Sequence, residues 1–202
     1  MSANATSNAA TASTEYRRRA IAAARELAEA GGYDAVQMRD VVRRSGMSSA
    51  TIYRRFSSKD HLLAAVRLEW IRELRAIKGG RLRGATAGDR VADLLHATVR
   101  AFARSPELGK AVILASQAAD TGVRETLAES YEVTNAIVRE AVAGEPIDVE
   151  EYVMLVGIAW NGALVSWAQG RMSLDDVDHL LQRAARLLLA AAREGGPARP
   201  GC

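Results

Sequence analysis

The chain has 202 residues, of which 49% are apolar and 25% charged. This balance is typical of a globular protein and excludes disordered, fibrous and collagen-like chains. The only cysteine, Cys202, excludes an internal disulfide and a cysteine-ligated metal centre, which favours a reducing, cytoplasmic setting. Residues 1–80 carry 14 Lys and Arg against 8 Asp and Glu, whereas residues 81–202 carry 13 against 16. An anionic polymer is therefore expected to bind the first part of the chain.

Ala, Leu and Arg are abundant and there are only four prolines, so we expect an all-α protein. Residues 1–14 lack the basic and Leu-rich segments of a secretory signal and are expected to form a disordered arm. Apolar periodicity then predicts a first helix over about 15–30, ended by Gly31 and Gly32, and a second over about 37–44.

A turn at Ser45 and Gly46 follows, and Ser48 is placed to cap a third helix over about 49–56. This helix is too short to be stable alone, so Ile52 and Phe56 must pack against the two preceding helices. Residues 57–60 form a variant of the capping box and open a fourth, connecting helix to about 78. Residues 15–62 thus form one expected domain.

Two short helices joined by a tight turn in the basic part of the chain predict a helix-turn-helix that binds DNA. With Ile52 and Phe56 turned inward, the third helix has an outer side made of Ser49, Ala50, Tyr53 and Arg54. Arginine can bind guanine O6 and N7, a small Ser or Ala allows close approach, and a tyrosine hydroxyl can reach a phosphate.

Lys59 is unusual because a cation in the first turn of a helix opposes the helix dipole. A DNA phosphate beyond the surface would offset that cost. A solvated surface lysine is the alternative explanation.

The motif Thr-Ile-Tyr-x-x-Phe-x-x-Lys-x-x-Leu at residues 51–62, preceded by the run at 36–42, closely resembles the DNA-binding domain of TetR-family transcriptional regulators. The resemblance is strong over residues 15–62. It implies that Ala50, which stands where many members have Gly, faces bases together with Ser49 and Arg54. The full DNA-contacting set that we expect, phosphate contacts included, is Gln37, Ser48, Ser49, Ala50, Thr51, Tyr53, Arg54 and Lys59.

A glycine-rich stretch at 79–88 is the expected boundary to a second domain, at 79–194, followed by a flexible tail at 195–202. Helices are predicted in this domain at about 89–104, 107–117, 121–142, 149–169 and 174–194. The resemblance implies that the last two helices pair with their copies in a homodimer, which would make the operator palindromic. Packing within one chain would give the same apolar stripes. The expected interface residues are Trp160, Leu164, Trp167, Leu180, Leu181, Ala184, Leu187 and Leu188.

The resemblance also implies a small-molecule pocket among the other helices. Short stretches near residues 31–39, 59–63 and 144–146 are similar to the branch of the family that represses sterol catabolism in actinobacteria. This similarity implies an effector that is a coenzyme A thioester of a steroid or fatty acid. The expected pocket residues are Phe102, Ile113, Leu114, Gln117, Tyr131, Met154, Ile158 and Asn161.

Other classes of protein fit less well. Residues 152–170 carry no charge, but only 13 of them are apolar, whereas a membrane-spanning helix needs about 20 mainly apolar residues. His61, His96 and His179 are scattered, so no catalytic constellation can be assembled, and neither an enzyme nor a cofactor is expected. Acidic residues at 175–178 fit the first turn of a helix better than a metal site. A DNA-binding protein without an effector remains the main alternative.

Overall fold

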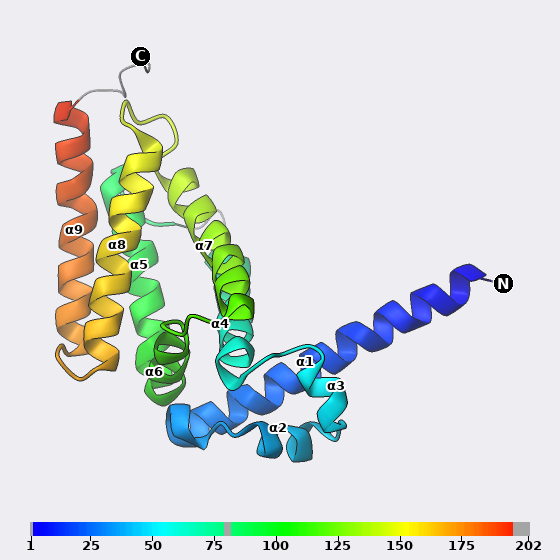
Figure 1. Cartoon of the computed structure of the whole chain (residues 1–202). Coiled ribbons are helices and arrows are strands. Elements are labelled where there is room, and N and C mark those ends of the chain that lie inside the picture. Colours follow the sequence, from blue (N-terminus) through cyan, green and yellow to red (C-terminus); the bar gives the residue numbers. More distant parts are fainter. Residues whose placement is uncertain (1, 79–81, 196–202) are drawn as a thin grey trace. The chain divides into compact units, whose positions relative to one another are not determined.

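The computed structural model describes residues 2–78 and 82–195. Over these residues the chain forms nine α-helices and no strand, which confirms the predicted all-α class (Figure 1). The first three residues of the expected boundary, 79–81, and residues 196–202 of the expected tail lie outside the described residues. The helices are α1 (Ser2–Ala35), α2 (Met38–Ser45), α3 (Ser49–Tyr53), α4 (Lys59–Lys78), α5 (Ala87–Arg104), α6 (Pro106–Ala115), α7 (Thr121–Ala141), α8 (Val149–Ala168) and α9 (Leu174–Gly195).

These helices form two compact units that interleave in sequence. The first unit contains residues 2–69 and Pro106–Ala128, that is α1 to α3, the first half of α4, all of α6 and the start of α7. The second unit contains the rest of α4 and α7 together with α5, α8 and α9. We call Pro106–Ala128 the α6–α7 corner, since it packs with the N-terminal helices although it follows α5 in the chain.

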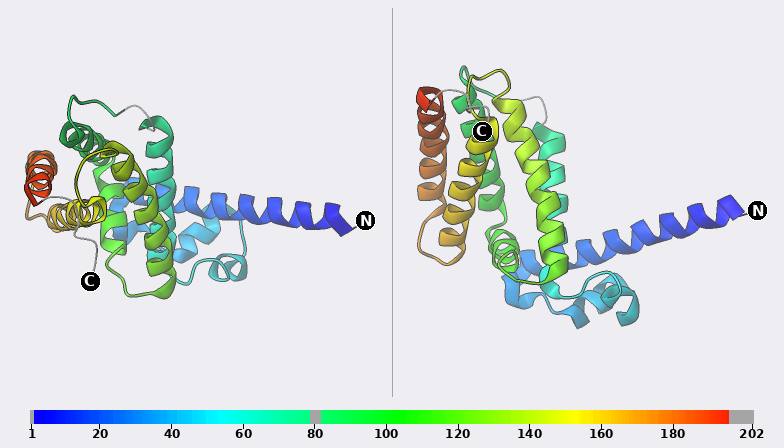
Figure 2. Two further views of the ribbon diagram at one scale, coloured as in Figure 1. Left: turned by 90° about the horizontal axis from the view of Figure 1, so that it is seen from above. Right: turned by 45° about the horizontal axis from the view of Figure 1, so that its top comes forward.

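Helix α1 begins at Ser2, where the sequence analysis expected a disordered arm. Figure 2 shows this N-terminal part continuing straight out of its unit. Residues 2–14 contain five alanines and neither glycine nor proline, so no residue in this segment breaks a helix. The predicted stop is present as a kink, because Gly31 and Gly32 have non-helical backbone angles, with φ of +71° at Gly32.

The core of the first unit lies between α1, α2, α3 and α4. Val41, Ile52, Phe56, Leu62 and Leu63 have no exposed surface. The α6–α7 corner adds to this core, since α6 packs along α1 and the start of α7 brings apolar side chains against α4. The residues of that second contact are Ala64, Ala118, Val123 and Leu127.

The second unit is built on α9, against which both α5 and α8 pack. The Tyr152 hydroxyl on α8 donates a 2.8 Å hydrogen bond to the Ala185 carbonyl of α9. The Phe102 ring of α5 contacts the rings of Trp70, Trp160 and Trp167 at centroid distances of 5.1, 6.3 and 5.5 Å. None of the described helices is both long and apolar enough to cross a membrane.

Candidate nucleic-acid interface

The turn between α2 and α3 depends on a glycine. Gly46 has a φ of +67° and its N–H donates a 3.1 Å hydrogen bond to the Val42 carbonyl, which ends α2. A Cβ at Gly46 would lie 2.9 Å from the Arg19 guanidinium. That guanidinium in turn donates to the Ser45 carbonyl. The left-handed backbone conformation therefore requires glycine here, and a side chain would also have to displace the Arg19 guanidinium.

Helix α3 begins as predicted. The Ser48 Oγ accepts a 3.2 Å hydrogen bond from the Thr51 N–H and lies 2.9 Å from the Thr51 hydroxyl. The helix is shorter than the expected 49–56, since it ends at Tyr53 and the chain continues as a turn to Phe56. Ile52 and Phe56 are nevertheless completely buried, and they fix which side of α3 faces outward.

The outward side of α3 carries the four residues that the sequence analysis placed there. Ser49, Ala50 and Arg54 are exposed, and Tyr53 has 54% of its surface exposed. Thr51 is half-buried. Small side chains at Ser49 and Ala50 let this helix approach a groove closely, and the guanidinium and phenol flank them. Contact of these side chains with DNA stays a prediction.

Helix α2 adds two cations that were not in the predicted DNA-contacting set. The Arg39 and Arg43 side chains are 87% and 81% exposed, and four residues apart they lie on one side of the helix. Their ion-pair partner is Asp40, at 3.9 Å from Arg39 and 3.1 Å from Arg43. In a helix-turn-helix the first helix crosses the DNA backbone, which is a general signal that could have identified them.

Gln37 precedes α2 and is exposed, and its amide donates a 2.9 Å hydrogen bond to the Asp34 carbonyl. The basic run at 17–19 is used within the first unit. Arg17 lies over the Phe56 ring at 5.6 Å, and Arg18 pairs with Glu15 at 2.8 Å.

Lys59 is held by Tyr33 rather than extended into solvent. Its Nζ lies 3.7 Å from the centroid of the Tyr33 ring and 3.4 Å from the Tyr33 carbonyl oxygen. The Tyr33 hydroxyl donates a 2.7 Å hydrogen bond to Asp60. Burial and then the nearby Asp60 carboxylate raise the pKa of Tyr33 to about 12, so the phenol stays neutral.

A polar junction fastens the end of the helix-turn-helix to the α6–α7 corner. The Ser57 Oγ lies 3.0 Å from both Asp120 carboxylate oxygens and 3.2 Å from the His61 Nδ1. Asp120 also caps α7, accepting from the Val123 N–H at 3.2 Å. We call Ser57, His61 and Asp120 the 57–120 junction.

The surroundings of the 57–120 junction determine the charge states of Asp120 and His61 and the space beside the His61 ring. The Val123 N–H is the main cause of a lowered pKa at Asp120, which is therefore ionised. Burial lowers the pKa of His61, and its Nδ1 accepts from the Ser57 N–H at 3.3 Å, as a neutral ring can. A Cβ at Gly122 would lie 2.4 Å from that Nδ1, so only glycine fits beside the ring.

The expected pocket residues differ in their exposure. Phe102 and Ile113 are buried, Leu114 and Tyr131 are 38% and 37% exposed, and Gln117 is exposed. The three remaining candidates lie at the surface of α8, with exposures of 58% for Met154 and 63% for Ile158, and Asn161 is also exposed. Their i, i+4, i+7 spacing places them in one stripe along the helix.

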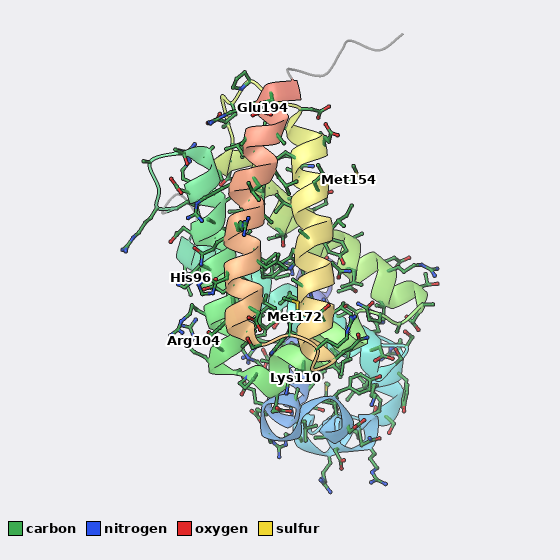
Figure 3. The ribbon with its side chains drawn as sticks, turned by 90° about the vertical axis from the view of Figure 1, so that its left-hand side faces the viewer. His96, Arg104, Lys110, Met154, Met172 and Glu194 are labelled. Atoms are coloured by element: carbon green, nitrogen blue, oxygen red, sulfur yellow. The ribbon has the colours of Figure 1, made fainter. Side chains whose placement is uncertain are left out.

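The residues expected at the dimer interface also differ in their exposure. Leu164, Trp167 and Leu181 are buried within their own chain. Leu180 and Leu187 are 46% and 57% exposed, and Trp160, Ala184 and Leu188 are half-buried. Figure 3 views α8 and α9 side by side and labels Met154 on α8. We call Met154, Ile158, Leu180 and Leu187 the α8–α9 apolar face.

Comparison with known proteins identifies the family. Residues 20–66 match the model for bacterial regulatory proteins of the tetR family, and residues 84–188 match the tetracyclin repressor-like C-terminal domain. The chain is 32% identical over 181 residues to the HTH-type transcriptional repressor KstR of Mycobacterium tuberculosis, covering 88% of this chain and 82% of that one. It is also 32% identical to KstR of Rhodococcus jostii, covering 88% and 84%.

Solved structures agree with these matches. A TetR transcriptional regulator from Rhodococcus sp. RHA1 aligns with a TM-score of 0.78 and 28% identity over 87% of this chain and 96% of that one. The transcriptional regulator FadR from Bacillus subtilis, solved with stearoyl-CoA, aligns with a TM-score of 0.61 and 18% identity over 86% and 97%. The named relatives are regulators, which confirms the prediction that the chain is not an enzyme. The chain belongs to the TetR family of bacterial transcriptional regulators.

Proposed function

We propose that this protein is a cytoplasmic repressor that binds a palindromic operator as a homodimer and leaves it when a small hydrophobic effector binds. The observation that supports DNA binding best is that α3 has one buried side and one exposed side. Ile52 and Phe56 are completely buried, while Ser49, Ala50, Tyr53 and Arg54 are all outward. The similarity to the KstR repressors supports repression as the direction of control.

The proposed DNA contacts fall into two groups, those to base edges and those to backbone phosphates. Arg54, Ser49 and Ala50 would face base edges in the major groove. Gln37, Thr51, Tyr53 and Lys59 would hold phosphates, and Ser48 would fix the start of the helix at the backbone. We add Arg39 and Arg43 of α2 to the phosphate contacts, because both are more than four-fifths exposed.

The dimer would form through the α8–α9 apolar face. Its four large apolar side chains are between 46% and 63% exposed in the single chain, although α8 and α9 pack against each other. A second copy would cover them, and Asn161 would join this surface with Ile158 and Met154. Exposed apolar patches of this kind mark interaction sites, and a two-fold dimer explains a palindromic operator.

The effector is proposed to be an acyl thioester of coenzyme A, carrying a steroid or a fatty acyl chain. The resemblance to the sterol-catabolism branch supports this class, and the FadR complex with stearoyl-CoA indicates that the fold can accept an acyl-CoA. Phe102, Ile113, Leu114, Gln117 and Tyr131 remain the candidates for its pocket. The α6–α7 corner would transmit effector binding to the DNA-binding helices, since the 57–120 junction joins it to the end of the helix-turn-helix.

Selection of bound duplexes from a random pool, with and without a panel of acyl-CoA thioesters, tests both parts of the proposal. We expect enrichment of a palindrome that is lost when one thioester is added. A palindrome that no thioester affects would favour the alternative of a DNA-binding protein without such an effector. Failure to enrich any site would contradict the repressor proposal itself.

A further inference from the structure

Lys59 and Tyr33 form a contact that the DNA-binding proposal does not explain. The ammonium lies over the face of the Tyr33 ring at 3.7 Å from the centroid. The same ammonium is 3.4 Å from the Tyr33 carbonyl oxygen, which also accepts from the Val36 N–H at 3.3 Å. The ring contact and the hydrogen bond of the Lys59 side chain thus both involve one residue, 26 positions earlier in the chain.

The contact offsets the unfavourable place of Lys59 in α4. A cation in the first turn of a helix opposes the helix dipole, and Lys59 is the first residue of α4. The face of an aromatic ring and a carbonyl oxygen near the end of α1 both attract a cation. Tyr33 therefore supplies locally the negative potential that would otherwise come only from a phosphate.

The ring itself is held in place from its other end. The Tyr33 hydroxyl donates a 2.7 Å hydrogen bond to the carboxylate of Asp60, the neighbour of Lys59 on α4. The Tyr33 side chain and the first turn of α4 are consequently joined twice, through the ring face and through the hydroxyl. An ammonium has three N–H donors, and one bond to the Tyr33 carbonyl leaves donors for another acceptor.

We propose that Tyr33 is a positioning residue for DNA binding, whose ring orients the Lys59 ammonium toward a backbone phosphate before DNA arrives. The inference depends on the phosphate role proposed for Lys59. Its physical basis is pre-organisation: a lysine has about 2 kcal/mol of rotamer entropy, which a free side chain loses on binding. The ring removes part of that loss without contacting DNA.

The test uses the full-length protein and a mixed-sequence duplex, with affinity measured over a range of salt concentrations. Lys59→Ala should reduce the slope of log affinity against log salt by about one unit per site. Tyr33→Leu keeps the charge and removes the ring, and should weaken binding by about 2- to 10-fold. Tyr33→Phe keeps the ring and should bind within about 2-fold of the wild type. Tyr33→Leu combined with Lys59→Ala should bind no more weakly than Lys59→Ala alone.

A second readout is independent of DNA. The proton resonances of the Lys59 ε-methylene should be shifted upfield by the ring beneath the ammonium, in the wild type and in Tyr33→Phe. The shift should disappear in Tyr33→Leu. Thermal unfolding of each variant, compared with the wild type, separates this local change from general loss of the fold.

The outcomes distinguish the phosphate role of Lys59 from the positioning role of Tyr33. If Lys59→Ala leaves the salt slope unchanged, the phosphate role of Lys59 is wrong and the inference fails with it. If Lys59→Ala lowers the slope but Tyr33→Leu binds as the wild type does, only the inference about Tyr33 is overturned. Equal losses in Tyr33→Phe and Tyr33→Leu would also overturn it, because the hydroxyl rather than the ring would then be responsible.

Discussion

The outer side of α3 and the α8–α9 apolar face are both exposed, but they are exposed for opposite chemical reasons. On α3 every large aliphatic side chain is buried, and the exposed residues are small, polar or cationic. On α8 and α9 large aliphatic side chains remain exposed after the chain has folded, with Ile158 at 63% and Leu187 at 57%. The first surface suits a hydrated polyanion, and the second suits an apolar partner such as a second copy of the chain.

The difference shows which of the two surfaces tolerates a new charge. A charge added to α3 changes an interface that is already polar, whereas a charge added to the α8–α9 apolar face must be desolvated if a partner covers it. The largest expected effect therefore lies in the second unit.

Leu187→Glu should abolish self-association. An unpaired carboxylate in an apolar interface costs several kcal/mol, so we expect the dimer dissociation constant to rise by on the order of 100-fold or more. Sedimentation equilibrium measures it directly. His179→Glu is the matched control, because it places the same side chain at another exposed position of α9. If Leu187→Glu stays dimeric, the α8–α9 apolar face is not the interface.

This pair of helices also shows what the sequence could not predict. The periodicity of α8 and α9 predicted one apolar stripe on each helix, but periodicity does not tell whether a stripe packs inside the chain or against a second subunit. Leu164 and Leu181 were assigned to the interface and Ile158 to the pocket, whereas in the single chain the first two are buried and Ile158 is 63% exposed. On α3 the same reasoning succeeded, because Ile52 and Phe56 were its only large aliphatic or phenyl side chains and left one possible orientation.

Polar contacts between residues far apart in the chain also could not be predicted from the sequence. The capping serines at 48 and 173 could be recognised because a cap acts within three residues, and the Asp176 N–H donates to the Ser173 hydroxyl at 3.1 Å. The 57–120 junction joins residues 63 positions apart, and nothing local to Ser57 or Asp120 indicates the partner. The same holds for Lys59, whose position was found unusual but whose contact with Tyr33 was not foreseen.

Gly122→Ala should destabilise the first unit by about 1–3 kcal/mol, because the new Cβ would overlap the His61 ring. Urea unfolding of the full chain measures the change. Gly157→Ala in α8 is the contrasting variant, since no atom lies within 4 Å of its Cβ position. Alanine there should stabilise the helix by up to about 1 kcal/mol. Equal destabilisation by both variants would show that the close packing at His61 is not the cause.

Arg54→Ala should relax sequence preference at one operator position, with a loss of about 1–3 kcal/mol in discrimination. Arg43→Ala should instead weaken binding to all sequences and reduce the salt slope by about one unit per site. Selection of bound duplexes and salt titration distinguish the two effects. If Arg54→Ala weakens all sequences alike, then Arg54 is a phosphate contact and the exposed side of α3 reads DNA through other residues.

The smallest expected effect is a dependence of stability on pH that arises in the first unit. Burial lowers the pKa of His61 below its ordinary value of 6.5, so the unfolded chain binds the proton more tightly than the folded chain does. The stability that this difference contributes is complete above pH 6.5 and is lost as the pH falls through the folded pKa.

Among the charged groups near His61, Asp120 and Glu125 oppose the lowering of its pKa and Arg17 adds to it. The lowered pKa of Asp120 acts only near and below its ordinary value of 3.8, so it does not interfere between pH 7 and 5. Urea midpoints across that range should therefore fall more steeply for the wild type than for His61→Gln, and parallel curves would show that the ring is not protected from protonation by the fold.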